Sequence, residues 1–173
     1  FSTFLSFLST LEDAGYVVSY SLLNAADYHI PQDRHRVFIV GFLKELNCTF
    51  YFPKPFGKPY VTLRKAIGNI TENPRSYTNE NVIQEYGKWI NHDIFAGLWD
   101  AKFMARNRVR SWNETSFTIQ AKAKNCPLHP QAPKMKYVSQ NQRVFLQGAE
   151  HLYRRLSIRE CARIQIGRAS CRE

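Results

Sequence analysis

The amino-acid sequence predicts a mixed α/β chain that begins with one helix and one antiparallel pair of strands and continues into a smaller, irregular α+β region. Apolar residues recur at helical spacing over residues 1–14, and two runs of β-branched and aromatic residues follow at 16–23 and 37–42. The link between the two runs is too short for a helical crossover, so we expect the strands to pair antiparallel. A helix followed by such a pair is how a doubly wound sheet often ends.

The first region is expected to cover residues 1–52. Leu8 and Leu11 lie on the apolar face of the expected helix, and Gly15 stands where a helix commonly ends. The uninterrupted apolar run at 37–42 predicts a strand that is buried in a sheet.

The second region, residues 53–148, begins at a cluster of prolines that predicts a domain boundary. Thr62 is expected to cap a short helix that runs through Asn69. Beyond this helix we expect a polar loop at 73–81, a partly helical segment at 82–99, an extended segment at 106–119 and an irregular stretch at 127–133.

The last expected segment, residues 149–165, contains a helix over 156–165. Ser157 and Glu160 have the spacing of a capping box at the start of this helix. We expect residues 166–173 to be a non-native tail, because this run can be encoded by a nucleotide sequence that resembles a common sequencing adapter.

The composition favours a polyanionic partner. The formal net charge is +10 and the pI is about 9.6, which is typical of proteins that bind nucleic acid. The four cysteines form no CxxC pair, so reduced thiols in a cytoplasm and no metal site are expected. The longest apolar runs are too short to span a membrane, and we expect no membrane partner.

A first candidate site is made by Gln32, Arg34 and Arg36, which come just before the second strand. Alternate residues at the mouth of a strand point to the same side, and a buried strand would hold them rigidly. Paired guanidinium groups suit a planar polar ligand or a phosphate, because each offers a fixed fork of donors. A charged turn that leads into a strand is the alternative interpretation.

A second candidate site is the run of Arg106, Arg108 and Arg110. In an extended chain these side chains share one face at intervals of about 6–7 Å, close to the spacing of phosphates along a nucleic-acid strand. Trp112 could stack on a base or simply pack. The alternative is a solvated edge strand that its positive charge protects from aggregation.

Four separated segments share their order and spacing with one family. Residues 24–41 closely resemble motif VIII of the cytosine-C5 DNA methyltransferases, which centres on Gln-x-Arg-x-Arg. Residues 155–165 resemble motif IX, usually Arg-x-Leu-Thr-x-Arg-Glu-x-Ala-Arg-Leu-Gln. Residues 111–119 resemble the Trp-Asp-x-Pro-Ser-x-Thr-Ile stretch of bacterial members, and His129 with the following proline fits a short His-Pro element. The resemblance covers nearly the whole chain.

The resemblance implies a fold and an active-site role. Residues 1–52 would be the terminal helix and antiparallel strand pair of a Rossmann-like sheet in an S-adenosylmethionine-dependent methyltransferase. Arg36 would reach a target cytosine flipped out of the duplex, and Arg34 and Gln32 would shape the same loop. A guanidinium beside the cytosine O2 would stabilise the negative charge that develops when a cysteine attacks C6.

The resemblance also implies a target recognition domain over residues 53–148 that reads double-stranded DNA in the major groove. Its candidate DNA contacts are Arg106, Arg108, Arg110, Lys122 and Lys124. Motif IX would be scaffold, and a structural role is also what its residues favour on their own: Arg155, Arg159, Glu160 and Arg163.

The catalytic and cofactor-binding motifs of the family are expected to lie outside this sequence. The Pro-Cys nucleophile, the Glu-Asn-Val motif, the Phe-x-Gly cofactor loop and motif X would lie upstream of Phe1 or downstream of Gln165. The binding residues for S-adenosylmethionine would therefore lie in a missing N-terminal methyltransferase half, and we expect the fragment alone to be inactive. Family members often carry glycine where His29 stands.

The function implied by the resemblance is transfer of a methyl group to C5 of cytosine at a specific DNA site. The source would be the cytoplasm of a bacterium, or a phage, and a restriction-modification system is expected. One alternative is a DNA-recognition subunit of a split methyltransferase without catalysis of its own. A tRNA methyltransferase of the same family is less favoured, because a long basic recognition region suits duplex DNA.

Overall fold

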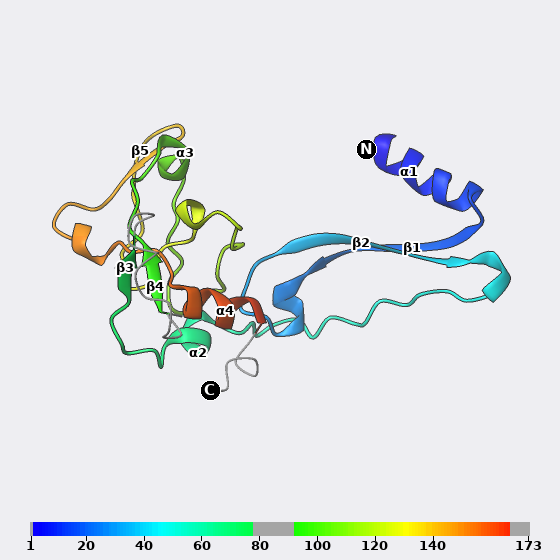
Figure 1. Cartoon of the computed structure of the whole chain (residues 1–173), viewed down its shortest axis with the longest axis horizontal. Coiled ribbons are helices and arrows are strands. Elements are labelled where there is room, and N and C mark those ends of the chain that lie inside the picture. Colours follow the sequence, from blue (N-terminus) through cyan, green and yellow to red (C-terminus); the bar gives the residue numbers. More distant parts are fainter. Residues whose placement is uncertain (1, 78–91, 167–173) are drawn as a thin grey trace.

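The computed structural model describes residues 2–77 and 92–166, and its two parts differ in shape (Figure 1). One part is a long β-hairpin that carries the first helix at its far end. The other, residues 53–166, is called the C-terminal region below. The mixed α/β class expected from the sequence is confirmed, whereas the assignment to a Rossmann-like sheet stays a prediction.

The hairpin agrees closely with the expectation for the start of the chain. Helix α1 (Ser2–Asp13) leads into strand β1 (Tyr16–Asn24), which pairs with strand β2 (His35–Leu43). The pairing is antiparallel over the full length of both strands. Gly15 makes the turn between helix and strand with φ +92°, a conformation that glycine adopts without steric cost.

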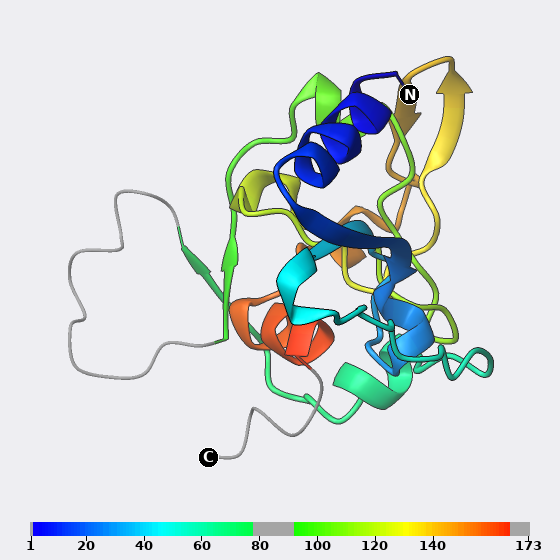
Figure 2. The same cartoon turned by 90° about the vertical axis from the view of Figure 1, so that its right-hand side faces the viewer.

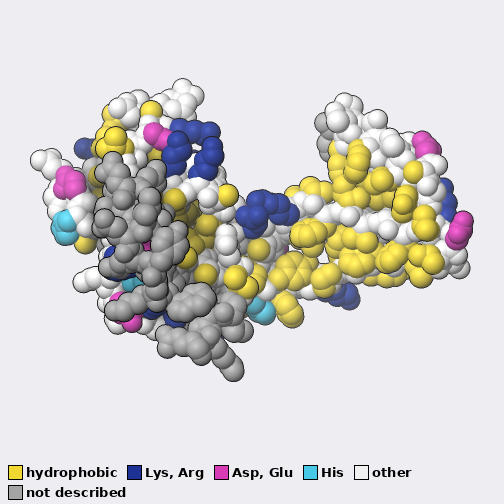
Figure 3. Space-filling model, in the orientation of Figure 1, with side chains coloured by type: hydrophobic (Ala, Val, Ile, Leu, Met, Phe, Trp, Pro, Cys, Tyr) yellow, Lys and Arg dark blue, Asp and Glu magenta, His cyan; other side chains and the backbone are white. Residues whose placement is uncertain are grey.

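The expectation that the second strand is buried is wrong for this chain. Val37 is 53% exposed and Phe38 is 49% exposed. Helix α1 packs on β1, where Phe4 meets Tyr20 edge-to-face at 5.3 Å, but the described residues provide no third strand for this sheet. Apolar side chains therefore cover the visible face of the hairpin (Figure 3). An apolar run predicts a strand, but its burial depends on what packs against it.

The segment after β2 returns along the hairpin toward the C-terminal region (Figure 1). Two hydrogen bonds to Asp27 hold it there: Phe56 N donates to the Asp27 carbonyl (2.9 Å), and the Tyr60 hydroxyl donates to its carboxylate (2.8 Å). The Tyr28 hydroxyl also donates to the Pro53 carbonyl (2.9 Å). The base of the hairpin is thereby tied to the chain that follows it.

The short helix expected near the start of the C-terminal region is α2 (Leu63–Ile67), which ends before the expected limit at Asn69. The Thr62 side chain accepts a hydrogen bond from Lys65 N and caps the helix.

The polar loop expected at 73–81 is wrong at Arg75–Tyr77, which forms strand β3. Asp93–Phe95 forms strand β4 within the segment 82–99, expected to be helical in part. The two strands pair in parallel, and an Arg75–Asp93 ion pair of 3.2 Å joins their first residues. Pairing between distant segments overrides local preference here. The remainder of these two expectations, residues 78–91, lies outside the described residues.

The middle of the C-terminal region is mostly irregular. Helix α3 (Ala101–Met104) is short and is capped by Asp100. The segment 106–119, expected to be extended, forms only isolated bridges, such as that between Val109 and Leu128. Strands β5 (Lys136–Ser139) and β6 (Gln142–Val144) form a second hairpin.

The chain ends in helix α4 (Ile158–Ile166), and its expected capping box is confirmed. Glu160 N donates to the Ser157 hydroxyl (3.2 Å), and Ser157 N donates to the Glu160 carboxylate (2.8 Å). Helices α4 and α2 lie side by side in both views (Figures 1 and 2). The first residue of the expected non-native tail, Ile166, is the last residue of α4. The rest of that tail, residues 167–173, lies outside the described residues.

Two apolar cores occupy the C-terminal region. The first lies between α2 and α4, and the second lies between α3 and the segments around Val109, Leu128 and Tyr153. Trp112 packs against the first core. Neither core includes a residue of the β1–β2 hairpin.

The short helical turn after β1 ends at a residue in an unusual backbone conformation. His29 has φ 62° and ψ 17°, in the left-handed region, and its ring stacks on Phe56 with 4.4 Å between ring centres. Residues with a Cβ atom adopt this conformation at a steric cost, whereas glycine does not.

We therefore expect His29→Ala to be less stable than His29→Gly by about 1 kcal/mol. Both variants lose the ring stacking, so their difference isolates the backbone cost. Urea unfolding of the two variants measures it, and equal stabilities would contradict the left-handed conformation of residue 29.

Candidate functional site

Arg34 and Arg36 lie together at the base of the β1–β2 hairpin. Both line a pocket of about 360 Å³ that Leu23, Tyr28 and Phe38 also line. The backbone of Arg36 is fixed by its pairing with β1, and its guanidinium is exposed and donates to the His35 carbonyl (2.6 Å). The pocket thus combines an apolar wall with two guanidinium groups.

The Arg34 side chain also connects the hairpin to the C-terminal region. Its Nη1 donates to the Ile119 carbonyl at 3.5 Å, and its backbone N–H donates to the Asn24 side chain (2.9 Å). The same Asn24 side chain caps the helical turn that follows β1. These contacts hold the side chain and the backbone of Arg34 in place.

Gln32 is not in this pocket. It is 1% exposed and forms an isolated bridge with Ser116 of the C-terminal region. Two main-chain hydrogen bonds beside Gln32 join the hairpin base to the C-terminal region: Ser116 N donates to the Pro31 carbonyl (2.9 Å), and Asp33 N donates to the Ser116 carbonyl (2.8 Å). The buried Gln32 Nε2 has no hydrogen-bond partner among the residues that the structure describes.

Asp33 joins the segment 31–36, called the arginine loop below, to the second candidate site. Its carbonyl accepts from the Thr118 hydroxyl (2.8 Å), and its carboxylate lies 3.4 Å from Arg110 Nη2. The carboxylate also accepts from the Asn24 side chain (3.1 Å). Sequence reasoning did not single out Asp33, although its place between Gln32 and Arg34 was a signal.

Arg106, Arg108 and Arg110 line one pocket of about 320 Å³, so the structure brings this expected set together. Their surroundings differ. Arg108 donates to the carbonyls of Phe103 (3.0 Å) and Lys102 (3.1 Å), and burial, helped by the charge of Arg106, lowers its pKa. Arg108 is therefore held against the protein.

Arg110 is held even more firmly. It donates to the Glu114 carboxylate (3.1 Å) and lies 4.2 Å from the centre of the Phe117 ring. Glu114 also accepts the Ser111 N–H (2.7 Å), and this bond, followed by the one from Arg110, lowers the Glu114 pKa to about 2 against the opposing effect of burial.

Arg106 is exposed and makes no hydrogen bond or ion pair to any part of the chain that is described. Lys122 and Lys124 are exposed as well, and Lys124 lies 3.6 Å from the Asp100 carboxylate. Figure 3 shows Lys and Arg side chains gathered beside α3 and at the junction with the hairpin. Arg106 and the two lysines are the expected contacts whose charges face solvent.

The expected motif IX residues make structural contacts. Arg155 is 2% exposed, lies 3.8 Å from the centre of the Trp99 ring, and donates to four backbone carbonyls, those of Phe95, Gly97, Leu98 and Lys124. Arg159 pairs with Glu72 (2.6 Å), and Arg163 donates to Asn69 (2.9 Å).

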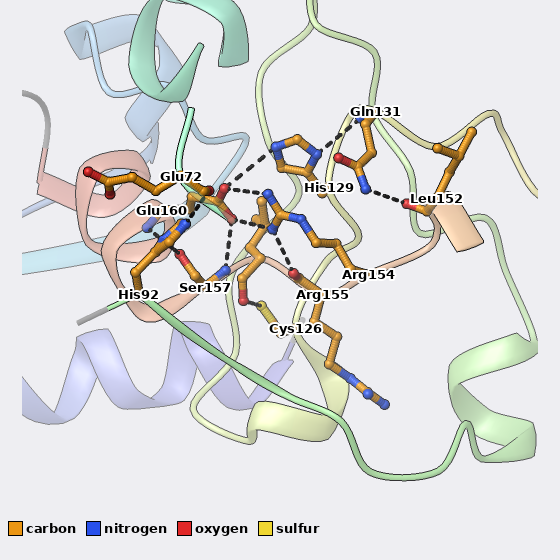
Figure 4. Close-up of polar contacts among 11 residues, drawn as sticks. Glu72, His92, Cys126, His129, Gln131, Leu152, Arg154, Arg155, Ser157 and Glu160 are labelled. Carbon is orange, nitrogen blue, oxygen red and sulfur yellow. Dashed lines mark hydrogen bonds and ion pairs between the residues drawn. The ribbon is translucent and has the colours of Figure 1, made fainter. Parts of the chain in front are cut away.

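Glu160 is the centre of a buried polar cluster (Figure 4). It is 1% exposed and receives two hydrogen bonds from Arg154, of 2.7 and 2.8 Å. Burial alone would raise the pKa of this carboxyl, but the hydrogen bonds and charge of Arg154 outweigh burial and lower the pKa. Sequence reasoning named Glu160 as a cap but did not foresee Arg154 as its partner.

His129 borders the same cluster as a neutral side chain. Its Nδ1 accepts the Gln131 N–H (3.2 Å), so the ring hydrogen is on Nε2, which lies 3.5 Å from Glu160 Oε1. Burial lowers the His129 pKa to about 4 despite the nearby Glu160 carboxylate. His129 therefore adds no charge to the ion pair that Glu160 forms with Arg154.

Within residues 2–77 and 92–166, the structure shows no group of three or more His, Cys, Asp or Glu side chains that could hold a metal ion. No helix in those ranges is long and apolar enough to cross a membrane.

A family model for the C-5 cytosine-specific DNA methylase matches residues 2–166. The chain therefore belongs to the C-5 cytosine-specific DNA methylase family.

Among its relatives are three proteins named as Type II methyltransferases. M.MthTI of Methanothermobacter thermautotrophicus is 48% identical over 94% of this chain, M.FnuDI of Fusobacterium nucleatum is 45% identical over 91%, and M.NgoPII of Neisseria gonorrhoeae is 40% identical over 91%. These alignments cover 49%, 47% and 47% of the respective relatives. The chain thus spans about half the length of the relatives it matches.

The low pKa of His129 predicts that the protein loses stability in mild acid. Between pH 6.5 and about 4 the unfolded chain binds a proton at this residue that the folded chain does not. The free energy of unfolding should therefore fall across this window as the pH is lowered, by up to about 3 kcal/mol.

Urea denaturation at a series of pH values measures this effect. His129→Gln keeps a side-chain N–H near Glu160 and should flatten the dependence, while His151→Gln controls for the loss of an exposed histidine. An unchanged pH dependence in His129→Gln would remove His129 as its source.

Proposed function

We propose that this chain is the C-terminal part of a DNA (cytosine-5-)-methyltransferase of a Type II restriction-modification system. The whole protein would transfer a methyl group from S-adenosylmethionine to C5 of cytosine at a specific site in double-stranded DNA. The observation that carries this proposal is the pocket shared by Arg34 and Arg36, which lies beside a cationic region in a chain matched by the family over residues 2–166. A cytoplasmic location in a bacterium, or a phage origin, stays a prediction.

In this proposal residues 1–52 belong to the catalytic domain, 53–148 form the target recognition domain, and 149–165 are the motif IX segment. The pocket at the base of the hairpin receives the flipped cytosine. The exposed guanidinium of Arg36 donates to the cytosine O2 and stabilises the negative charge that appears when a cysteine attacks C6. Arg34, which is held by Ile119, fixes the shape of the pocket.

The cofactor is not expected to bind to these residues. The pocket that Arg34 and Arg36 line has no acidic residue among its walls, so it does not suit the positively charged sulfonium and ammonium groups of S-adenosylmethionine. The cofactor site and the nucleophile are assigned to the rest of the protein, and the chain alone is expected to be inactive.

The exposed hairpin supports a missing N-terminal half as the partner. Leu22 is 64% exposed, and Val37 and Phe38 are about half exposed, on strands whose pattern is that of a buried sheet. Apolar area of this kind marks an interaction surface. The rest of the catalytic sheet would cover it.

A second candidate is a recognition subunit of a split methyltransferase. Both apolar cores lie within the C-terminal region, which favours a part that folds without the catalytic sheet. The gene upstream separates the two candidates: catalytic motifs in the same reading frame support one enzyme, whereas a separate complete gene for them supports a split enzyme.

For Arg36 we expect the substitution Arg36→Ala in the full-length protein to reduce the rate of methyl transfer by about 10²-fold or more. DNA affinity should change little, because the lost interaction forms with the reacting base. Single-turnover methylation and equilibrium DNA binding measure the two effects. Arg36→Lys keeps the positive charge but loses the forked guanidinium, so its rate of methyl transfer should lie between those of the parent and Arg36→Ala. Equal transfer rates in all three proteins would exclude Arg36 from the mechanism.

For Arg106 we expect Arg106→Ala to weaken binding of duplex DNA and to reduce the dependence of log affinity on log salt by about one. Arg108→Ala is the matched comparison within the same pocket. Because Arg108 holds the carbonyls of Phe103 and Lys102, its loss should also lower the melting temperature. If the Arg106 variant keeps the salt dependence of the parent, Arg106 does not touch a phosphate.

A further inference from the structure

Asp33 uses all four of its polar groups where the base of the β1–β2 hairpin meets the C-terminal region. Its backbone N–H and carbonyl bond to Ser116 and Thr118 of the C-terminal region. Its two carboxylate oxygens have partners as well, one on each side of this junction. Asp33 directly precedes Arg34, so whatever fixes Asp33 also restricts the arginine loop.

One carboxylate oxygen of Asp33 faces the hairpin. Oδ1 accepts a hydrogen bond from the Asn24 side chain (3.1 Å), and His35 Nδ1 lies 3.3 Å from the same oxygen. Because an ionised carboxylate only accepts hydrogen bonds, it holds the Asn24 amide with its nitrogen toward Asp33. The amide oxygen is then free to accept the backbone N–H of Arg34 (2.9 Å). The Asp33 carboxylate thereby sets the backbone position of Arg34 through Asn24.

The other carboxylate oxygen faces the C-terminal region. The two terminal nitrogens of Arg110 are divided between two carboxylates: Nη2 lies 3.4 Å from Asp33 Oδ2, and Nη1 donates to Glu114 (3.1 Å). The backbone carbonyl of Glu114 accepts from Leu63 N (2.9 Å), and Leu63 is buried in the first apolar core. A continuous series of contacts therefore runs from this core through Glu114 and Arg110 to the arginine loop.

The ion pair between Asp33 and Arg110 restricts geometry more than it stabilises the fold. The Asp33 side chain is 38% exposed and the Arg110 side chain is 28% exposed, and ion pairs in contact with solvent contribute little to stability. The guanidinium is planar, however, and donates only in fixed directions. Because Arg110 serves two carboxylates at once, the place of Asp33 relative to Glu114 is defined.

We propose that Asp33 is a positioning residue for methyl transfer, which holds Arg34 and Arg36 in a fixed place relative to the C-terminal region. This inference rests on the proposed function, in which the C-terminal region binds the DNA and the flipped cytosine enters the pocket that Arg34 and Arg36 line. Asp33 does not line that pocket and acts through Asn24 and Arg110. A displaced arginine loop would move the Arg36 guanidinium away from the cytosine O2.

The test uses the full-length protein in excess over unmethylated genomic DNA, with S-adenosylmethionine, so that a single turnover is measured at saturation. Asp33→Asn keeps the size of the side chain, removes its charge and adds a donor that faces Asn24. It should slow methyl transfer by about 10-fold, because small displacements of reacting groups have effects of this size.

DNA affinity and stability should not follow the rate of Asp33→Asn. Affinity for a labelled duplex in fluorescence anisotropy should stay equal or rise slightly, since a negative charge is lost beside the arginine-lined pocket. The melting temperature should change little. Glu150→Gln, which removes an exposed carboxylate elsewhere in the C-terminal region, is the matched control and should keep the parent rate. A parent rate in Asp33→Asn, or an affinity that falls in parallel with the rate, would overturn the proposal.

Arg110→Gln tests the same series of contacts from its other end, and keeps the proposal falsifiable if Asp33→Asn does not fold. It should slow the transfer measured at saturating DNA, and a parent rate would overturn the proposal. The double variant Asp33→Asn/Arg110→Gln should be no slower than the slower single variant, because both changes remove one link. Losses of rate that multiply would show that the two residues act independently, and would also overturn it.

The outcome separates this inference from the function on which it rests. A parent protein that does not methylate DNA contradicts the proposed function itself. A parent in which Arg36→Ala slows methyl transfer, while the variants of Asp33 and Arg110 keep the parent rate, contradicts only the positioning role of Asp33.

Discussion

Two backbone hydrogen bonds join the arginine loop to the C-terminal region, and the geometry of both candidate sites depends on them. They connect Ser116 to Pro31 and to Asp33, and they bury Gln32 between the two parts. Buried backbone groups are costly when unpaired, so this joint is a well-defined contact between segments far apart in the sequence. Next to this joint, Arg34 and Arg36 line one pocket. The Asp33 carboxylate lies beside Arg110, which lines the other pocket.

Positive charge serves two purposes in this chain. Arg154 and Arg155 are used inside the protein, one as the partner of Glu160 and one as a donor to four carbonyls. Removing one member of such a buried pair leaves a charge without compensation and costs far more than an exposed ion pair is worth. Arg106 and Lys122, in contrast, have their charge in solvent, as the proposed contact with DNA requires.

Local signals in the sequence were sufficient for part of this architecture. The helix at the start, the two strands, the Thr62 cap and the box made by Ser157 and Glu160 depend on neighbouring residues and could be predicted. The parallel pairing of β3 with β4 could not, because it joins segments separated by the residues between Tyr77 and Asp93.

The candidate site shows the same division. Alternation along a strand indicated that Arg34 and Arg36 share a side, and both line one pocket. No local rule distinguishes Arg106 from Arg108 and Arg110, because the difference lies in carbonyls and carboxylates supplied by Lys102, Phe103, Asp33 and Glu114.

The two apolar cores lie wholly outside the β1–β2 hairpin, and two of the hydrogen bonds that join the arginine loop to the C-terminal region are between main-chain atoms. Every residue except proline carries the same main-chain groups, so substitutions elsewhere on the surface of the C-terminal region leave these two bonds intact. Over evolutionary time such a region can change which surface it presents, or be exchanged as one block between genes, without re-registering the arginine loop. The surface of the C-terminal region is thus free to diversify, while the arginine loop stays under a separate constraint.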